Sequence, residues 1–532
     1  MGWVFLVDFS KQNKPMDILL LLWHDGLPAY THSQGEQMDQ THQIANLRQE
    51  FHPALQEFVA LGLQLEGEPA CKMEHREIES LISRVGNEIL RLLLQGHLTL
   101  RCKEEERRES VTGSDGEVRS LCRQGCERGL MTIFGKVTVR RRGYKAPGVE
   151  SVFPMDGELN LPPDNYSHGL RRRVAEEAAS HSFDETVSNI SKTTGGKVPK
   201  RQTEEVSVRA AQDFDKFYSE RKADAPEATS DILVMTVDQK GVVMRKEDLR
   251  PSTRKAAEKT KDTPGARLSP GEKPNRKRMS TVASVYTIEA RERTPEMIMG
   301  LTDEEKPKHP RCRNKRVWAS VEQEPEEVIQ AMFDEALRRD PEKKRPWAVL
   351  LDGGEKQLDL VLALILSLRP DVTVVLDFIH VLEYLWKAVY SFHSVGSKEA
   401  AGWVAERALK ILRGESADVV TALRQSLNLA KLGSEKREAV DKCANYLEKY
   451  AVLLDYDVFL KEGLPIATGV IEGACRHLIK DRMDLTGARW RLKRAEAVLK
   501  IRSLRSSGDL DAYWAFHENQ EHKRNHSYSD AA

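Results

Sequence analysis

Three acidic residues stand where they could bind metal ions together. Asp238 and Asp352 each end a short apolar segment that is typical of a buried β-strand, and Glu472 lies near the start of a late helix. Carboxylates that converge repel one another unless a divalent cation neutralises them, and hard oxygen ligands suit Mg²⁺ or Mn²⁺. Two such ions can hold the attacking and leaving oxygens of a phosphodiester displacement. The three acids therefore predict a two-metal site for phosphoryl transfer.

Each of these acids also has a purely structural interpretation. Asp238 could cap the turn after its strand, and Asp352 precedes two glycines, where a turn aspartate is common. Glu472 could be favoured by the dipole of its helix. Asp377 ends another apolar segment and is the rival of Asp352 for the second acid.

The elements that must position the acids indicate an α/β domain. Strands are predicted at residues 231–238, 241–245, 277–289, 346–352 and 371–377. Helices are predicted at 325–339 and 358–368, and the stretch from about 380 to 462 is predicted to be wholly helical. Three strands, a helix, a strand, a helix, a strand and a late helix follow the ribonuclease-H-like topology, in which the first and fourth strands are neighbours. This order favours Asp352 over Asp377 as the partner of Asp238.

Upstream of this domain, three short helices are predicted around a glycine turn. Ser182 and Glu185 form a capping box at the start of the second helix, and Pro199 precedes the third. Such a group is typical of a helix-turn-helix DNA reader, although an ordinary helical linker domain explains it too. The groove-facing residues would be those that open the third helix: Lys200, Arg201, Gln202 and Thr203.

A second set of basic residues follows Glu472. Arg489, Trp490 and Arg491 combine an aromatic ring with two cations, which suits stacking on an unpaired base, but a core tryptophan is an equal alternative. The helix that continues from Glu472 carries residues that could position phosphates or form a solvated surface. They are Arg476, His477, Lys480 and Arg482.

The composition of the 532-residue chain limits the class of protein. Its 82 Lys and Arg residues balance 82 Asp and Glu residues, and 40% of the chain is hydrophobic, as in globular proteins. The apolar runs are too short to span a bilayer, and the first residues lack the features of a secretory signal. Seven cysteines predict a reducing compartment, and Cys122 with Cys126 lacks a second pair of zinc ligands. P-loop, HExxH and GxSxG motifs are absent, which leaves metal-dependent phosphoryl transfer.

Five stretches of the chain resemble the ISKra4-type insertion-sequence transposases, relatives of the Mutator-like DDE group. They are TVDQKGVVMR, KRMSTVASVY, VLLDGG, VLDFIHVLEYLW and GVIEGACRHLIKDRMDLTGARWRLKRAEAVLKIRSLRSSGDLDAYWAFH. The resemblance runs from about Thr132 to His517 and is most specific around Glu472. It implies an α/β, RNase H-like catalytic domain with an all-helical insertion, preceded by helical and helix-turn-helix regions. Its implied acid triad is Asp238, Asp352 and Glu472, which would bind Mg²⁺ or Mn²⁺ in a two-metal site.

The resemblance also assigns roles to neighbouring residues. Asp377 and His380 match a (C/D)xxH element that follows the second acid, which implies a supporting or DNA-contacting role near the active site. The helical stretch before Glu472 corresponds to an insertion expected to help hold the transposon end. One departure is Gln239, where a glycine is expected after the first acid, because glycine permits close backbone approach and positive φ.

We therefore expect a DNA transposase that binds the terminal inverted repeats of an insertion sequence and catalyses metal-dependent cleavage and strand transfer. A catalytically inactive DNA-binding remnant and an RNase H-fold structure-specific nuclease are the alternatives. The expected partners are terminal-repeat DNA, target DNA and at least one further copy of the chain, without a membrane or a small-molecule substrate. The expected location is the bacterial cytoplasm, at the nucleoid.

The expected organisation begins with a partly disordered helical region at 1–130, a short β region at 131–165 and the helix-turn-helix at 166–228. The catalytic domain is expected at 229–520, with a basic loop at 246–277 and a helical insertion at about 383–464, and a tail follows at 521–532.

Overall fold

A computed structural model describes residues 47–221, 227–259, 277–301, 311–369, 371–429, 433–485 and 487–530 of the chain. The disorder predicted near the N-terminus and residues 260–276 of the predicted basic loop lie outside these residues. The described start of that loop holds a 3-10 turn at Lys246–Asp248 and helix α10 at Pro251–Lys259. No described helix combines the length and the apolar character needed to cross a membrane.

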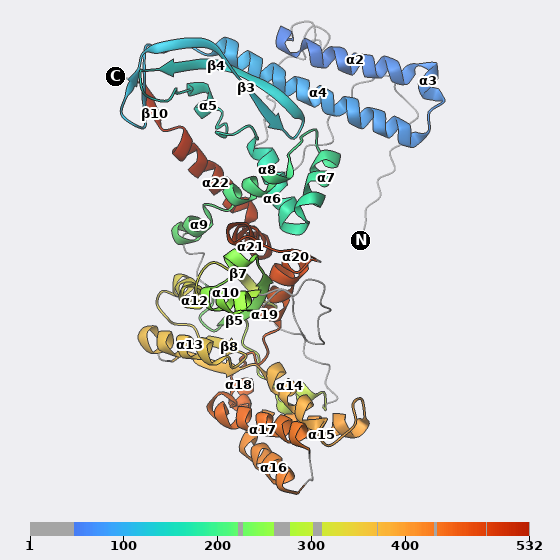
Figure 1. The fold of residues 1–532 in the computed structure, drawn as a ribbon, viewed down its shortest axis with the longest axis vertical. Helices are drawn as coiled ribbons and strands as arrows, with labels where there is room; N and C mark the ends of the chain where they lie inside the picture. Colours follow the sequence, from blue (N-terminus) through green and yellow to red (C-terminus); the bar gives the residue numbers. More distant parts are fainter. Residues whose placement is uncertain are drawn as a thin grey trace.

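The N-terminal part is a helical hairpin beside a β-hairpin (Figure 1). The region predicted as helical at 1–130 contains the long helix α4 (His75–Glu104), which begins at a capping box of Glu74 and Glu77. Residue Gln95 of α4 exchanges two hydrogen bonds with the backbone of Thr138 in strand β4, so the long helix is fixed to the β-hairpin. The preceding elements are a 3-10 turn (Gln49–Phe51), α2 (His52–Glu66) and α3 (Glu68–Cys71).

The β-hairpin begins at Leu121, before the short β region predicted at 131–165. Strand β3 (Leu121–Thr132) pairs with β4 (Gly135–Lys145), so the turn lies at residues 133–134. Gly135 opens β4 with a φ of 124°, a conformation that other residues rarely adopt.

The end of the chain returns to this N-terminal part. Strand β10 (Tyr528–Asp530) pairs with β1 (Val111–Gly113), which also pairs with β2 (Val118–Arg119). The short helix α5 (Pro154–Glu158) lies next to β4.

Helices occupy the region where a helix-turn-helix is predicted. They are α6 (His168–Ser180), α7 (Phe183–Thr193), α8 (Lys200–Ala210) and α9 (Phe214–Glu220). The capping box at the start of α7 is confirmed, since the Ser182 hydroxyl accepts from Glu185 N at 3.2 Å and the Glu185 carboxylate accepts from Ser182 N at 2.9 Å. Small buried residues on α6 and α8 pack against α21 (Leu492–Ser507), which joins these helices to the following domain.

A five-stranded mixed sheet forms the centre of that domain, in the order β7-β6-β5-β8-β9. Strands β5, β6 and β7 are antiparallel neighbours, whereas β8 and β9 run parallel to β5. The predicted adjacency of the first and fourth strands is confirmed, because β5 pairs directly with β8. The strands are β5 (Ile232–Val243), β6 (Lys277–Ile288), β7 (Arg313–Ser320), β8 (Trp347–Leu351) and β9 (Thr373–Leu376).

Two details of the predicted strand order are wrong. The expected turn between 231–238 and 241–245 does not exist, because Gly241 stays in the ladder opposite Met279 and β5 is one continuous strand. Strand β7 has no predicted counterpart, because its first residues are basic and only its second half is buried. The two errors compensate, so the sheet still opens with three antiparallel strands.

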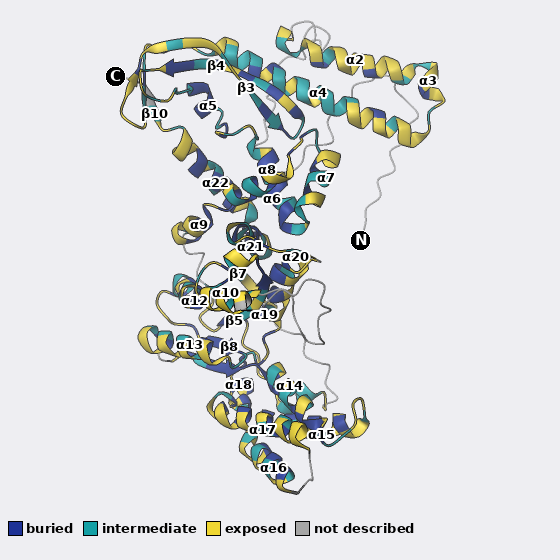
Figure 2. Ribbon diagram, in the orientation of Figure 1, coloured by how far each residue is buried: buried dark blue, intermediate teal, exposed yellow. Residues whose placement is uncertain are grey.

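Each face of the sheet packs on its own set of helices (Figures 1 and 2). Leu233, Met235 and Val237 lie on one face of the sheet. They pack against side chains of α9, α12 (Pro325–Arg339), α13 (Glu355–Leu368) and α22 (Leu510–Asn525). Val234 and its neighbours on β8 and β9 face the other side, as strand periodicity requires. That side is covered by α14 (Phe378–Val389), α15 (Lys398–Leu412), α16 (Ser416–Leu429), α17 (Ser434–Lys449), a 3-10 turn (Ala451–Leu453) and α18 (Tyr456–Lys461).

The described residues between β9 and residue 461 are helices and their connections, as predicted. After them come α19 (Gly469–Ala474), a π-helical turn (Cys475–Lys480) and α20 (Asp481–Met483), which lead into α21. The helix α19 lies against β5 and β6, so Glu472 reaches the second face of the sheet. A further short helix, α11 (Pro295–Met299), contacts α15.

Candidate active site

Three aspartates stand in one row across three neighbouring parallel strands. Thr236 of β5 pairs with Leu350 of β8, so Asp238 and Asp352 lie two residues further along at the same level. Leu351 of β8 pairs with Leu376 of β9, so the next residues are Asp352 and Asp377. Side chains at the same level of parallel strands point to the same face. The row therefore continues the face that packs on the helical insertion.

Asp238 contacts the helix that carries Glu472. Its Oδ2 accepts a hydrogen bond from Cys475 Sγ at 3.1 Å, and its Oδ1 accepts one from the amide of Gln239. Burial raises the pKa of the Cys475 thiol, and the charge of Asp238 raises it further, so the thiol keeps its proton and donates. Cys475 lies one turn after Glu472 and opens the π-helical turn, a feature frequent at functional sites.

Asp352 begins a glycine turn that is held by the helical insertion. Its Oδ1 accepts from Gly354 N at 3.0 Å, and Gly353 adopts a φ of 85°, which favours glycine. The hydroxyl of Tyr446 donates to the carbonyl of Asp352 at 3.0 Å, and that of Tyr450 donates to the carbonyl of Gly353. Tyr446 lies in the last turn of α17, and Tyr450 is the C-cap of that helix. The turn interpretation of Asp352 and its place in the acid row are therefore compatible.

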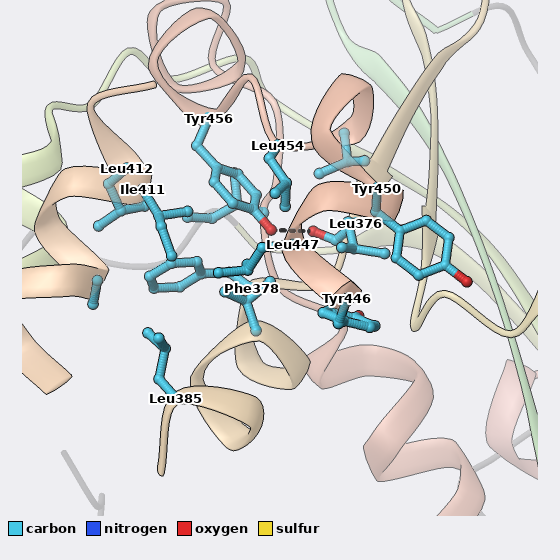
Figure 3. Close-up of a cluster of buried hydrophobic side chains, with 14 of the residues drawn as sticks. Leu376, Phe378, Leu385, Ile411, Leu412, Tyr446, Leu447, Tyr450, Leu454 and Tyr456 are labelled. Carbon is cyan, nitrogen blue, oxygen red and sulfur yellow. Dashed lines mark hydrogen bonds between the residues drawn. The ribbon is translucent and has the colours of Figure 1, made fainter. Parts of the chain in front are cut away.

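A third tyrosine holds the end of the neighbouring strand β9 (Figure 3). Tyr456 lies among buried side chains of α14, α15 and α17, and its hydroxyl donates to the carbonyl of Leu376 at 2.8 Å. Three tyrosines of the insertion thus fix the backbone next to Asp352 and Asp377. Sequence reasoning misses all three, because no local pattern connects these tyrosines with backbone carbonyls that lie 80 or more residues earlier.

Asp377 is fully buried and orients His380. As the N-cap of α14 it accepts from Ile379 N at 2.9 Å, and its Oδ2 also receives the hydroxyl of Thr468. His380 Nδ1 lies 3.3 Å from the same oxygen. This hydrogen bond raises the pKa of His380 although burial lowers it, and the charges of Asp377 and Asp352 raise it further. The structure therefore brings both residues of the (C/D)xxH element to the acid row.

Glu472 completes a group that could hold a metal ion. One ligand atom each from Asp377, His380 and Glu472 lies within 4.8 Å of the others, and the described residues contain no second such group. The ligand atoms of the predicted trio, Asp238, Asp352 and Glu472, do not all lie within 4.8 Å of one another. Asp352 and Asp238 lie next to this group. The charge of Asp352 raises the pKa of His380, and Asp238 accepts a hydrogen bond from Cys475.

The acids at this site have few positive partners. Within the described part of the chain, none of Asp238, Asp352 and Glu472 forms an ion pair with a lysine, arginine or histidine. Ion pairs are common elsewhere in the chain, as in the buried pair of Glu335 and Arg316 at 2.8 Å. Uncompensated carboxylates in one row favour a bound cation.

Gln239 does not need the conformation that glycine would provide. It lies within β5 opposite Thr281, and it is not among the described residues with positive φ. The need for positive φ therefore does not arise at Gln239.

The residues predicted to face a DNA groove differ in exposure. Lys200 and Arg201 are exposed on α8, where they form ion pairs with Asp184 at 2.6 Å and Glu205 at 3.1 Å. Gln202 is half-buried. Thr203 is fully buried and cannot face a groove in this conformation.

The second basic set is divided in the same way. Arg476, Lys480 and Arg489 are all exposed. The side chain of Arg476 is 78% exposed and forms an ion pair with Asp481 at 3.8 Å. His477 is half-buried and Arg491 is exposed.

Arg482 and Trp490 are buried, which contradicts the roles in DNA contact predicted for them. The Trp490 indole donates to Met483 O at 3.1 Å, and its ring lies edge-on to Phe183 of α7. The Arg482 guanidinium lies 4.7 Å from the Trp490 ring centroid and donates to Ala178 O. These contacts join the helices α6 and α7 to the domain that holds the five-stranded sheet, so both side chains serve the core.

Comparisons with known proteins add little. No protein-family model matches the chain, and no curated protein matches it in sequence. A solved structure of the Drosophila P element transposase strand transfer complex aligns with 66% of this chain and 80% of its own, at 8% identity and a TM-score of 0.20. At that TM-score the likeness carries no argument about this protein.

Proposed function

We propose that this protein is a DNA transposase of the DDE type, with Asp238, Asp352 and Glu472 as its catalytic acids. The observation that carries the proposal is the row of three aspartates, one in β5 and one directly after each of β8 and β9, close to Glu472. Among the described residues, Asp238, Asp352 and Glu472 lack cationic partners. The resemblance of the surrounding sequence to ISKra4-type transposases points to the same acids.

The strand order supports an RNase H-like catalytic domain. Three antiparallel strands followed by two parallel ones, with the first strand between the second and the fourth, match the topology expected from the resemblance. The helices between β9 and α19 stand where the helical insertion is expected. Fold alone does not define function, so the proposal rests on the acids and their setting.

The donor set fits Mg²⁺ or Mn²⁺. Carboxylate oxygens are the ligands these ions prefer, and the three proposed ligands are half-buried or exposed, so an ion and its waters can reach them. When bound, two such ions would supply Lewis acidity at the attacking and leaving oxygens of a phosphodiester.

The chain's own residues would orient the reaction. The tyrosine bonds to the backbone fix Asp352 beside Asp238, and Cys475 fixes Asp238 relative to α19. Exposed Arg476 and Lys480 lie on the turns that follow Glu472, where they could bind DNA phosphates. No protein side chain is expected to bond covalently to DNA, and a freed 3′-OH would attack the target strand.

A strand-joining assay tests the function as a whole. The purified chain is incubated with labelled DNA that carries the terminal inverted repeats, with unlabelled target DNA, and with Mg²⁺ or Mn²⁺. We expect cleavage at the repeat boundary and labelled ends joined to target DNA. Cleavage without joining and without repeat specificity would indicate a structure-specific nuclease, and binding without cleavage in either metal would indicate an inactive remnant.

Joining two ends requires more than one copy of the chain, so we propose a dimer or a larger assembly on DNA. The readout is the mass of the complex with paired ends, measured against the mass of the chain alone. A single copy per pair of joined ends would contradict this part of the proposal.

A further inference from the structure

His380 is held in one orientation by a buried carboxylate. Asp377 approaches the imidazole at Nδ1, at 3.3 Å, and is itself fixed by the hydroxyl of Thr468 and the amide of Ile379. A carboxylate at Nδ1 places the ring proton there and leaves the lone pair on Nε2. Both oxygens of Asp377 accept hydrogen bonds and its side chain is fully buried, which suits a residue that positions His380.

The imidazole of His380 lies at the acid site. His380 and Glu472 belong to the described group whose ligand atoms lie within 4.8 Å of one another, and His380 keeps 30% of its side chain exposed. A ring with an oriented nitrogen beside uncompensated carboxylates has the arrangement of a metal-binding histidine and its supporting carboxylate.

A second histidine–aspartate pair in the chain shows the contrast. His517 Nδ1 lies 2.7 Å from Asp213, but His517 is almost fully buried and Asp213 also pairs with Arg524. That pair belongs to a closed network in which the carboxylate already has a cation. The pair of Asp377 and His380 differs because unpaired acids lie next to the imidazole.

We propose that His380 binds a divalent metal ion through Nε2 together with Glu472, with Asp377 as its positioning residue, and that this nitrogen makes the site favour Mn²⁺ over Mg²⁺. The inference rests on the proposed function, because it names a ligand of the same metal site. Imidazole suits transition-metal ions, whereas Mg²⁺ prefers oxygen ligands and retains water. The site would thus combine oxygen and nitrogen ligands, unlike one made only of carboxylates.

Electron spin resonance of bound Mn²⁺ tests the proposal without DNA. The full chain is titrated with Mn²⁺ while the signal of the free ion gives the affinity, and pulsed measurements on the bound ion detect coupling to ¹⁴N. We expect a ¹⁴N coupling typical of imidazole in the unmodified protein. Bound Mn²⁺ with only oxygen and water couplings would overturn the proposal, whatever any variant does.

Variants then identify the histidine. His380→Asn keeps a side-chain donor near the position of Nδ1 but removes Nε2, so we expect loss of the ¹⁴N coupling and Mn²⁺ affinity weakened on the order of 10-fold or more. Mg²⁺ affinity, measured by competition, should change far less. The matched control is His75→Asn on the exposed start of α4, which should bind both ions like the unmodified chain.

A third variant tests the positioning role. Asp377→Asn retains an N-cap for α14 but changes the partner of His380, so Mn²⁺ affinity should fall by roughly 10- to 100-fold. Unchanged Mn²⁺ binding in His380→Asn, or equal weakening of Mn²⁺ and Mg²⁺, would contradict the inference. The proposed function would survive that result if Mg²⁺ still supports cleavage and joining, so the two failures are distinguishable.

Discussion

Removing one tyrosine hydroxyl of the helical insertion should lower the rate of DNA cleavage far more than the free energy of unfolding. In Tyr446→Phe the ring keeps its stacked contact with Tyr384, at 3.9 Å between centroids, and only the hydroxyl is lost. That hydroxyl donates to the carbonyl of Asp352 at 3.0 Å. A hydrogen bond of this kind contributes about 1 kcal/mol to stability.

The magnitude decides the interpretation. A loss of about 1 kcal/mol from a typical free energy of unfolding of roughly 5–15 kcal/mol leaves almost every molecule folded. A misplacement of about 1 Å at a catalytic group, in contrast, can lower a rate on the order of 100-fold. If Tyr446 fixes Asp352, DNA cleavage should fall about 10-fold or more while the folded fraction stays the same.

The matched control is Tyr513→Phe. The Tyr513 hydroxyl donates to Ala210 O at 2.6 Å, which joins α22 to the end of α8, so its loss should cost similar stability. Urea unfolding measures the free energy of both variants, and cleavage of terminal-repeat DNA measures their rates. The reasoning is refuted if Tyr446→Phe cleaves at the unmodified rate, or if Tyr513→Phe loses as much activity.

Three further predictions concern stability and the departure from the expected motif. Burial would raise the pKa of Glu335, but the hydrogen bond from Arg338 and the charge of Arg316 lower it to about 2. Ionised Glu335 therefore contributes about 3 kcal/mol to the free energy of unfolding above about pH 4.5, and this contribution is lost as the pH falls toward 2. The difference between the unfolding free energies of the unmodified chain and Glu335→Gln should therefore shrink over that range, and a constant difference would contradict this origin. Trp490→Ala should destabilise the protein by about 3–5 kcal/mol in urea unfolding, because it empties a core position, whereas a near-zero change would restore a surface role. Gln239→Gly should weaken β5 by about 1 kcal/mol and leave DNA cleavage within a few-fold; a large gain in cleavage would show that glycine is required there.

The parts of the fold that the sequence predicts well are those with continuous apolar runs. Strands β8 and β9 are short, largely apolar and followed by Asp352 and Asp377, so their positions and their acids follow from the residues themselves. The capping box at Ser182 is equally local. In each case the signal lies within a few residues of the structure that it specifies.

The errors arise where distant contacts decide the outcome. Gly241 suggests a turn, yet pairing with Met279 keeps it extended. The basic run at 313–316 hides a strand whose pairing with β6 is visible only in three dimensions. Trp490 lies between two arginines, which suggests exposure, but it is enclosed by Phe183, from a helix about three hundred residues earlier.

The site shows the same limit. Its acids follow from strand ends and from the resemblance, but the hydrogen bonds that orient them come from α17 and from Thr468, far away in the chain. The proximity of Glu472 to His380 likewise depends on how α19 packs on the sheet.

The most direct test of the central claim compares Asp352→Asn with Asp334→Asn. Asp352 lies in the acid row, whereas Asp334 is an exposed aspartate on α12 outside it, so the two substitutions remove the same charge from different places. Labelled terminal-repeat DNA is incubated with each protein and with Mg²⁺, Mn²⁺ or a chelator. We predict metal-dependent cleavage at the repeat boundary by the unmodified chain and Asp334→Asn, and none by Asp352→Asn although it still binds the DNA. Cleavage by Asp352→Asn at the unmodified rate would contradict the account.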